Sequence, residues 1–280
     1  MEPKDALADA FSEASSTEAA AFLSMFSFSS LLFFAAVEGH VSAYLSHSSV
    51  DGMSEPFLEA GLFSVGPRFD TATLVLSSLF VGSYLVVAAM RVQLLGYDWS
   101  SKDTYTEGIE RPTAHMFLGT LVFAPTFLGS LFLPAGIYFY LNGSFSGSLL
   151  ALVGLGVFPA ASVAVSFAFY VPYTAVMRNH FVEAFVNSWE LSSGNRLALS
   201  FLFISLVGVF VVVALSFVSA YVALWDVSTA LAQLVLSVGY AAVLVFAVYL
   251  VAAVFRYYNA DRDRRQDFLP VGDEMEERLG

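Results

Sequence analysis

Residues 229–255, TALAQLVLSVGYAAVLVFAVYLVAAVF, contain no charged side chain and are followed by Arg256. About 20 apolar residues in a helix cross roughly 30 Å of hydrocarbon, so this stretch is long enough to span a membrane. Its hydrophobic residues are continuous rather than alternating, which favours a helix over a strand of a β-barrel. The stretch therefore predicts a transmembrane helix.

The rest of the chain has the same character. Of its 280 residues, 58% are hydrophobic and only 13% are charged, a balance outside the usual range of soluble proteins. Five further apolar runs are long enough to span, at residues 19–37, 71–90, 116–140, 149–176 and 197–224. The sequence thus predicts an all-α integral membrane bundle of six transmembrane helices. The expected domains are an acidic cytoplasmic N-terminal segment, the transmembrane domain and an acidic cytoplasmic tail, at 1–18, 19–255 and 256–280.

Basic residues indicate how this bundle is oriented. On one side of the six predicted spans lie 11 of the 12 Lys and Arg residues, namely Lys4, Arg91, Lys102, Arg111, Arg178, Arg196, Arg256, Arg262, Arg264, Arg265 and Arg278. Arg68 lies alone on the other side, in the long predicted external loop 38–70. Because short cytoplasmic loops are enriched in Lys and Arg, we expect a multi-pass protein of the cell membrane with both termini in the cytoplasm.

Acidic residues and the absence of cysteine exclude several functions. The net charge is −12, and the acidic side chains lie in tails, loops and span ends. Acidic surfaces with little lysine are typical of a halophilic archaeon, and an ordinary acidic tail is the alternative. No basic patch is present to neutralise phosphates, so we expect no nucleic acid partner. Zero cysteines exclude disulfides, thiol catalysis and thiolate metal sites.

A cytoplasmic loop carries a second helical pattern. Its apolar residues recur at helical spacing and are Phe181, Val182, Phe185, Val186 and Trp189. The polar residues on the other side are Glu183, Asn187 and Glu190. We expect a cytoplasmic amphipathic helix in the membrane interface, capped by Asn179 and closed by Gly194, with Trp189 at the headgroup level. A bracing role under the bundle is favoured over substrate binding.

The same loop carries a family resemblance. Residues 183–196, EAFVNSWELSSGNR, resemble the signature A-L-x-x-S-W-x-L-t-x-G-n of the membrane domain family of glycerophosphoryl diester phosphodiesterases. Phe185 stands for the usual Leu and Ser192 for the usual Thr, and the acidic balance resembles haloarchaeal members of unknown function. The resemblance implies a helical membrane scaffold. In fused relatives the phosphodiesterase chemistry belongs to a separate soluble domain, which these residues do not include.

Ionisable residues lie near the ends of the predicted spans. Glu38, His40 and His47 follow the first span, and Arg91 and His115 lie near the inner face. The carboxylate and the two histidines after the first span could bind a metal or sense pH, but we interpret Glu38, His40 and His47 as hydrated interfacial residues. No phosphate-binding loop, HExxH motif or nucleophile elbow is found. The sequence therefore predicts no catalytic residue, no cofactor and no metal site.

Proline interrupts two of the predicted spans. Pro125 and Pro134 fall in the third, and Pro159 and Pro172 in the fourth. Proline removes a backbone donor, so paired breaks could form a midplane cavity, although ordinary kinks and close packing through small residues are favoured. The serines within the spans favour interhelical hydrogen bonds over a polar path, and they are Ser27, Ser29, Ser30, Ser162, Ser166, Ser205 and Ser216.

Two functions agree with these patterns. The leading hypothesis is a non-enzymatic membrane scaffold or envelope-associated protein, favoured by the spans free of charge, the interfacial helix and the family resemblance. The alternative is a permease or transporter component for a neutral or lipid-like solute, favoured by the proline-interrupted spans. Expected partners are membrane lipids and a membrane protein or a second copy of the chain.

Overall fold

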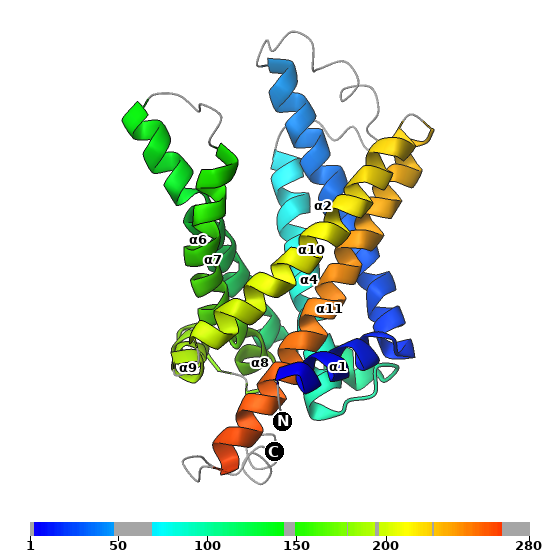
Figure 1. The fold of residues 1–280 in the computed structure, drawn as a ribbon. Coiled ribbons are helices and arrows are strands. Elements are labelled where there is room, and N and C mark those ends of the chain that lie inside the picture. Colours follow the sequence, from blue (N-terminus) through cyan, green and yellow to red (C-terminus); the bar gives the residue numbers. More distant parts are fainter. Residues whose placement is uncertain are drawn as a thin grey trace.

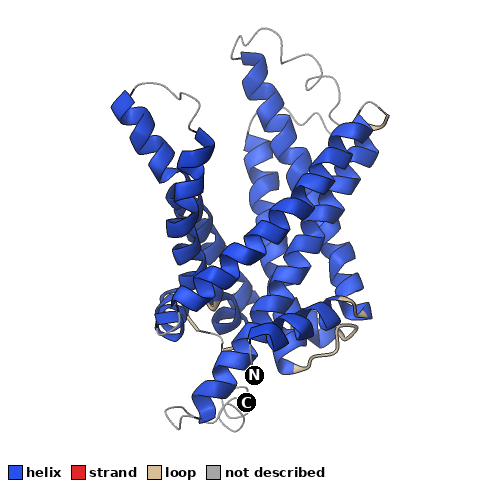
Figure 2. Cartoon of the chain, viewed as in Figure 1, coloured by secondary structure: helices blue, strands red, loops and turns tan. Residues whose placement is uncertain are grey.

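The computed structural model describes residues 3–47, 69–142, 149–177, 179–193, 196–225 and 227–264. These residues form an all-helical bundle, and no strand occurs among them (Figures 1 and 2). Its helices are α1 (Pro3–Ala14), α2 (Thr17–His47), α4 (Phe69–Leu95), α5 (Lys102–Thr106), α6 (Glu110–Asn142), α7 (Leu149–Ala168), α8 (Tyr170–Ala175), α9 (Phe181–Ser193), α10 (Arg196–Trp225) and α11 (Thr229–Arg264).

Among the described residues, five helices have a segment long and apolar enough to cross a membrane. These segments are Thr17–Phe34, Thr73–Leu95, Glu110–Tyr138, Gly154–Ala175 and Ala230–Tyr258. They confirm the membrane character that the hydropathy predicts. The remaining predicted span, 197–224, coincides with α10, many of whose side chains lie outside the described part of the chain. Six spans therefore stay a prediction.

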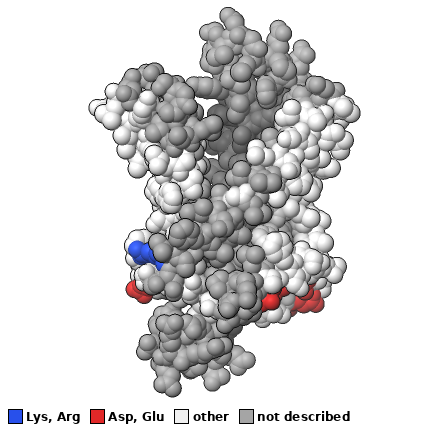
Figure 3. Space-filling model, in the orientation of Figure 1, with Lys and Arg blue, Asp and Glu red and all other residues white. Residues whose placement is uncertain are grey.

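The bundle has two arms that share one end (Figure 1). α6 packs along α7, whereas α2 packs along α4 and α11, and α10 joins the arms by packing against both α7 and α11. α1 lies across the lower end in this view, where the start of α1 and the end of α11 are found together. In Figure 3 the coloured charged side chains also lie toward this end. The described surface above them is uncharged on this face, as a membrane-embedded band requires.

α1 is held to α11 by a tilted pair of aromatic rings and by an ion pair. The rings of Phe11 and Phe246 lie 4.6 Å apart, and Nη2 of Arg256 is 2.7 Å from both carboxylate oxygens of Glu13. Both charged side chains are partly exposed, so the ion pair contributes little to stability, and apolar contact holds most of this junction.

The predicted fourth span is divided in two. α7 ends at Ala168, Phe169 has φ −85° and ψ −3°, and α8 begins at Tyr170. Pro172 in the first turn of α8 has no N–H to donate to the preceding turn, and its ring crowds that turn. The break is therefore a consequence of proline. Pro125 and Pro134 lie inside α6 and Pro159 inside α7, and neither helix ends at these positions.

Two glycines with positive φ flank the loop between α4 and α6, one directly after α4 and one shortly before α6. Gly96 has φ +69° and directly follows the last residue of α4, a left-handed conformation that glycine adopts without strain. Gly108, with φ +53°, lies two residues before α6. Between them, α5 is capped by Ser101, whose Oγ accepts a hydrogen bond from the Asp103 amide. The segment is thus a compact loop at the lower end of α4.

Candidate functional site

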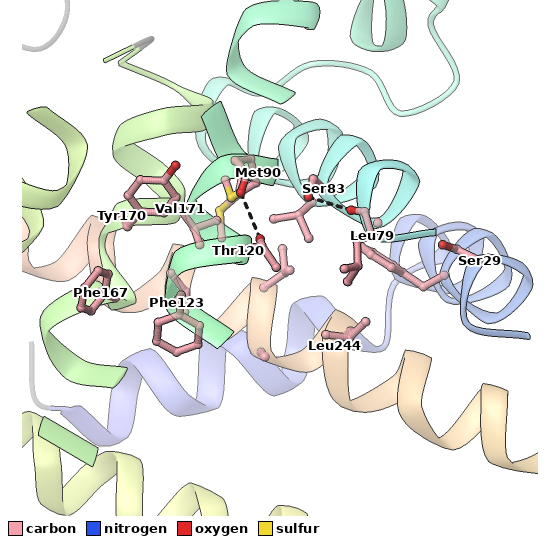
Figure 4. A pocket seen from close by; sticks show the side chains of 18 of the residues that line it. Ser29, Leu79, Ser83, Met90, Thr120, Phe123, Phe167, Tyr170, Val171 and Leu244 are labelled. Atoms are coloured by element: carbon pink, nitrogen blue, oxygen red, sulfur yellow. Dashed lines mark hydrogen bonds between the residues drawn. The ribbon is translucent and has the colours of Figure 1, made fainter. Parts of the chain in front are cut away.

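A cavity of about 430 Å³ lies between the two arms (Figure 4). Its walls come from α2, α4, α6, α7, α8 and α11, with one residue from α10. The lining residues are Phe26, Ser29, Ser30, Phe33, Ser78, Leu79, Gly82, Ser83, Val86, Met90, Met116, Gly119, Thr120, Phe123, Ala164, Phe167, Ala168, Tyr170, Val171, Phe203, Tyr240, Leu244, Ala247, Val248 and Val251. This volume falls in the range of pockets that hold small molecules.

The described cavity wall contains no charged side chain. Its polar groups are hydroxyls, and most of them donate to main-chain carbonyls. Ser83 donates to the Leu79 carbonyl at 2.8 Å, and Thr120 donates to the Met116 carbonyl at 3.0 Å. Such bonds satisfy the hydroxyl hydrogen within the same helix. The wall is therefore mainly apolar, with isolated oxygen atoms facing a hydrocarbon-like space.

One of these bonds connects two helices. Ser29 of α2 donates to the Ser78 carbonyl of α4 at 3.3 Å, and Ser78 in turn donates to the Leu74 carbonyl at 2.8 Å. Both serines are buried. The sequence predicts interhelical bonding for the serines of the spans, and Ser29 makes such a bond. Ser27 and Ser166 instead donate to carbonyls one turn back in their own helices.

Aromatic side chains close the cavity toward α9. The Tyr170 hydroxyl donates to the His115 carbonyl, and the Tyr170 ring stacks on Phe185 of α9 with centroids 4.3 Å apart. Phe185 also meets the edge of Phe167 at 4.3 Å. Tyr170 lies so close to Gly119 that a Cβ there would overlap the phenol ring. Glycine at this position lets α6 and α8 approach, which leaves room for the Tyr170 ring that stacks on α9.

α9 is a helix, as predicted, but its apolar residues face two directions. Phe181 and Phe185 pack on the core, and the small residues Ala184, Ser188 and Ser192 are buried. The other apolar residues are exposed: Val182 by 65%, Val186 by 50% and Trp189 by 52%. At 100° per residue, this exposed stripe lies between the packed stripe and the polar stripe of Glu183, Asn187 and Glu190.

Two contacts hold α9 against its neighbours, and a cap closes its start. Ser188 donates to the Ser166 carbonyl of α7 at 2.6 Å, and the Arg196 guanidinium lies over the Trp189 ring at 3.6 Å from its centroid. The predicted cap at Asn179 falls one residue early, because the His180 carbonyl accepts the first helical bond and the His180 amide donates to the Glu183 carboxylate at 3.2 Å. Gly194 lies outside the described residues.

Arg91 is buried rather than hydrated. Only 1% of its surface is exposed, and its Nη1 and Nη2 atoms donate to the main-chain carbonyls of Glu107 and Gly108 at 2.7 Å and 2.9 Å. The Tyr97 ring lies 5.9 Å from its guanidinium carbon. At this position near the predicted inner face, loop carbonyls therefore take the place of water around the guanidinium.

Two of the four histidines, His115 and His180, lie next to each other in the structure. His115 is half-buried, and its ring lies 5.5 Å from that of His180, whose Nε2 is 2.6 Å from Nη2 of Arg111. Glu38, His40 and His47 belong to α2, but their side chains lie outside the described part of the structure. Within the described ranges, no three His, Cys, Asp or Glu side chains come close enough to hold a metal ion.

Sequence reasoning missed the cavity. The prolines pointed to a midplane space, yet none of the four lines the described cavity. The signal that could have found it is a set of small residues on three helices, with Ser29 and Ser30 on α2, Gly82 on α4, and Gly119 and Thr120 on α6. Small side chains leave volume only where helices face one another, and hydropathy carries no information about that facing.

No family model matches this chain, and comparisons with curated proteins and with solved structures yield no match either. The function must therefore be argued from the geometry of the cavity and of α9.

Proposed function

We propose that this protein holds a neutral, lipid-like solute in the intramembrane cavity and acts as a permease or carrier component. The observation that carries the proposal is the cavity wall, which is lined by apolar side chains and by hydroxyls, with no charge among its described residues. An ion or a zwitterion would lose its hydration there without a counter-charge, whereas an apolar molecule gains burial. The chemistry of the wall therefore favours the second of the two sequence-based hypotheses over the first.

The proposal includes a topology of six spans with both termini in the cytoplasm. The charge bias of the loops supports it, as does the position of the start of α1 and the end of α11 at one end of the bundle. Reporters fused after residue 140 should be external, and reporters fused after residue 190 or at Gly280 should be cytoplasmic. An external C-terminus would contradict the six-span topology.

Filling the cavity tests the binding function. A Cβ built on Gly82 meets no atom within 4 Å, so Gly82→Phe has room to enter the cavity without a backbone clash. Gly129→Phe is the matched control, because Gly129 is also helical and open, but it is exposed and lies outside the cavity lining. Both substitutions remove a flexible residue from a helix, so their effects on helix propensity match.

Each variant is purified in mild detergent, and the co-purifying apolar molecules are measured by mass spectrometry. Reconstitution into proteoliposomes then measures flux of the molecule that co-purifies. We expect Gly82→Phe to lose both the bound molecule and its flux, and Gly129→Phe to keep both. Equal retention by the two folded variants would contradict ligand binding in this cavity.

A membrane scaffold is the second candidate, and the exposed stripe of α9 favours it. Val182, Val186 and Trp189 together offer apolar surface beside a polar stripe, as expected of a helix in the cytoplasmic interface. The Arg196 guanidinium beside Trp189 suits anionic headgroups, and the resemblance of residues 183–196 to the phosphodiesterase membrane domain family supports the same role. Gentle extraction should then retain a partner protein, a second copy or bound lipid. Repeated recovery of the bare chain would count against the scaffold.

A further inference from the structure

The cavity hydroxyls carry information about the polar end of the solute. We infer that the ligand is a long-chain molecule with a neutral hydroxyl headgroup, such as a fatty alcohol or an isoprenoid alcohol. This inference rests on the proposed binding function and adds the class of ligand. It follows from which hydroxyl hydrogens in the wall are already used and which oxygen atoms are left.

Five wall hydroxyls already donate their hydrogens to main-chain carbonyls, and one of them is the Tyr170 hydroxyl, which donates to the His115 carbonyl. Ser29 donates to Ser78, and the hydroxyls of Ser78, Ser83 and Thr120 each donate one turn back within their own helices. A hydroxyl that donates keeps two lone pairs on its oxygen and can still accept. These oxygens can therefore accept a hydrogen bond from a ligand group that donates one.

Ser30 offers the complementary group. It lines the cavity beside Ser29, is only 4% exposed, and has no hydrogen-bond partner among the residues that the structure describes. Its hydroxyl can therefore donate to a ligand oxygen. An alcohol both donates and accepts, so it can use both kinds of group in the wall, donating to one acceptor oxygen and accepting from a donor such as Ser30. The leucine, valine and phenylalanine side chains of the wall contact the hydrocarbon chain of the ligand.

Other headgroups fit this wall less well. A carboxylate or phosphate would be desolvated without a counter-charge on any described lining residue. An ester or ketone can accept from Ser30 but cannot donate to the oxygens of Ser78 and Ser83. A plain alkane makes no polar contact at all. The wall therefore ranks a neutral alcohol above the acid, the ester and the alkane of equal chain length.

The test uses photolabelling of the full chain in detergent micelles. The probe is a dodecanol that carries a diazirine in its chain, and labelled residues are mapped by mass spectrometry. Unlabelled dodecanol, dodecanoate, methyl dodecanoate and dodecane compete with it. We expect label on cavity residues, and we expect dodecanol to compete about tenfold better than the ester, the effect of one additional hydrogen bond.

Two variants and one control complete the experiment. Ser78→Ala should lower the preference for dodecanol over methyl dodecanoate several-fold, because only the alcohol donates to the Ser78 oxygen. Ser30→Ala should weaken competition by both compounds and leave their ratio unchanged, because both accept from Ser30. Ser24→Ala should change neither the competition nor the ratio, because Ser24 lies on α2 with Ser30 but is exposed and outside the cavity lining. The ratio of two ligands on one protein is compared, so a general loss of folded protein does not imitate the effect.

The outcomes separate the two proposals. Saturable labelling of the cavity with equal competition by all four compounds, or with dodecanoate as the best competitor, would overturn the alcohol headgroup and leave the binding function standing. Labelling that no compound displaces, and that Gly82→Phe does not reduce, would overturn the binding function itself.

Discussion

Arg91 and Glu107 are joined through the main chain: Nη1 of the buried guanidinium donates to the Glu107 carbonyl at 2.7 Å. Nη2 of the same group donates to the neighbouring Gly108 carbonyl at 2.9 Å. The positive φ of Gly108 belongs to the turn that presents these two carbonyls to one planar donor. The arginine therefore fastens the loop after α4 to the lower end of the bundle.

Arg91→Lys should destabilise the protein by about 1 to 3 kcal/mol, the range for charge-assisted hydrogen bonds. A lysine ammonium is a point donor and cannot reproduce the fork of the guanidinium. Thermal unfolding in detergent measures the loss, and protease sensitivity of residues 98–108 locates it. Lys102→Ala in the same loop is the control, because Lys102 is exposed. Equal effects of the two substitutions would show that the fork is unimportant.

Gly156→Ala should destabilise the packing of α6 on α7 by about 1 to 3 kcal/mol, the usual range for overpacking. A Cβ at Gly156 would overlap the main-chain carbonyl of Leu131, and backbone cannot move aside as a side chain can. Gly154→Ala is the matched control on the same helix, since a Cβ there meets no atom within 4 Å. The control should be neutral or stabilising by up to about 1 kcal/mol. Equal melting temperatures for the two variants would contradict this close approach.

The turn at Asp98 should depend on pH. The amide and hydroxyl of Ser100 both donate to Asp98 Oδ1 at 2.8 Å, and these bonds hold the pKa of the carboxyl below its ordinary value. A carboxyl with a lowered folded-state pKa stabilises the fold above its unfolded pKa of about 3.9, and this contribution is lost as the pH falls through the folded pKa.

Ser100→Ala removes the hydroxyl donor and leaves the amide, so the pKa of Asp98 should rise part of the way toward its ordinary value. An NMR titration of the Asp98 carboxyl carbon measures it. Thr106→Val is the control, because the Thr106 hydroxyl bonds to the Lys102 carbonyl instead. An unchanged titration in Ser100→Ala would place the cause of the shift elsewhere.

Phe185→Ala should destabilise the protein by about 2 to 4 kcal/mol, because the ring is packed between Tyr170 and Phe167 with both centroids at 4.3 Å. Val182→Ala, one turn earlier on α9, removes an exposed side chain and should change stability by less than about 0.5 kcal/mol in detergent. Chemical unfolding of the two variants tests the difference. Similar losses would mean that the two apolar stripes of α9 are equally packed.

Hydropathy predicted that the helices are apolar enough to cross a membrane, but it did not predict where a helix breaks. The transfer free energy of a long apolar run depends on composition, so the run at 229–255 is recognisable from the sequence. The break at Phe169 depends on local backbone sterics. Pro172 predicts a disturbance of the helix there, but the sequence does not distinguish a kink from a helix end. Composition decides whether a segment spans, and local geometry decides its shape.

The candidate site was harder to predict than the helices. Ser29 and Ser78 are separated by 49 residues in the chain yet meet through a hydrogen bond. Nothing in either helix alone indicates that pairing. The apolar face of α9 is a milder case, since spacing placed Phe185 and Val182 together and only the neighbouring helices separate them. Periodicity defines a face, and tertiary packing decides what covers it.

The exposed stripe of α9 should lie in the membrane interface. α9 runs from Phe181 to Ser193, which is too short to cross the bilayer, and its apolar stripe and polar stripe flank one another. Spin labels at Val182 and Val186 should be accessible to oxygen dissolved in lipid. Labels at Glu183 and Asn187 should be accessible to an aqueous relaxation agent, because these residues lie on the polar stripe. The experiment is done in liposomes, where both phases are present. If all four labels are mobile and reach only the aqueous agent, α9 faces water on both stripes and is no membrane-surface helix.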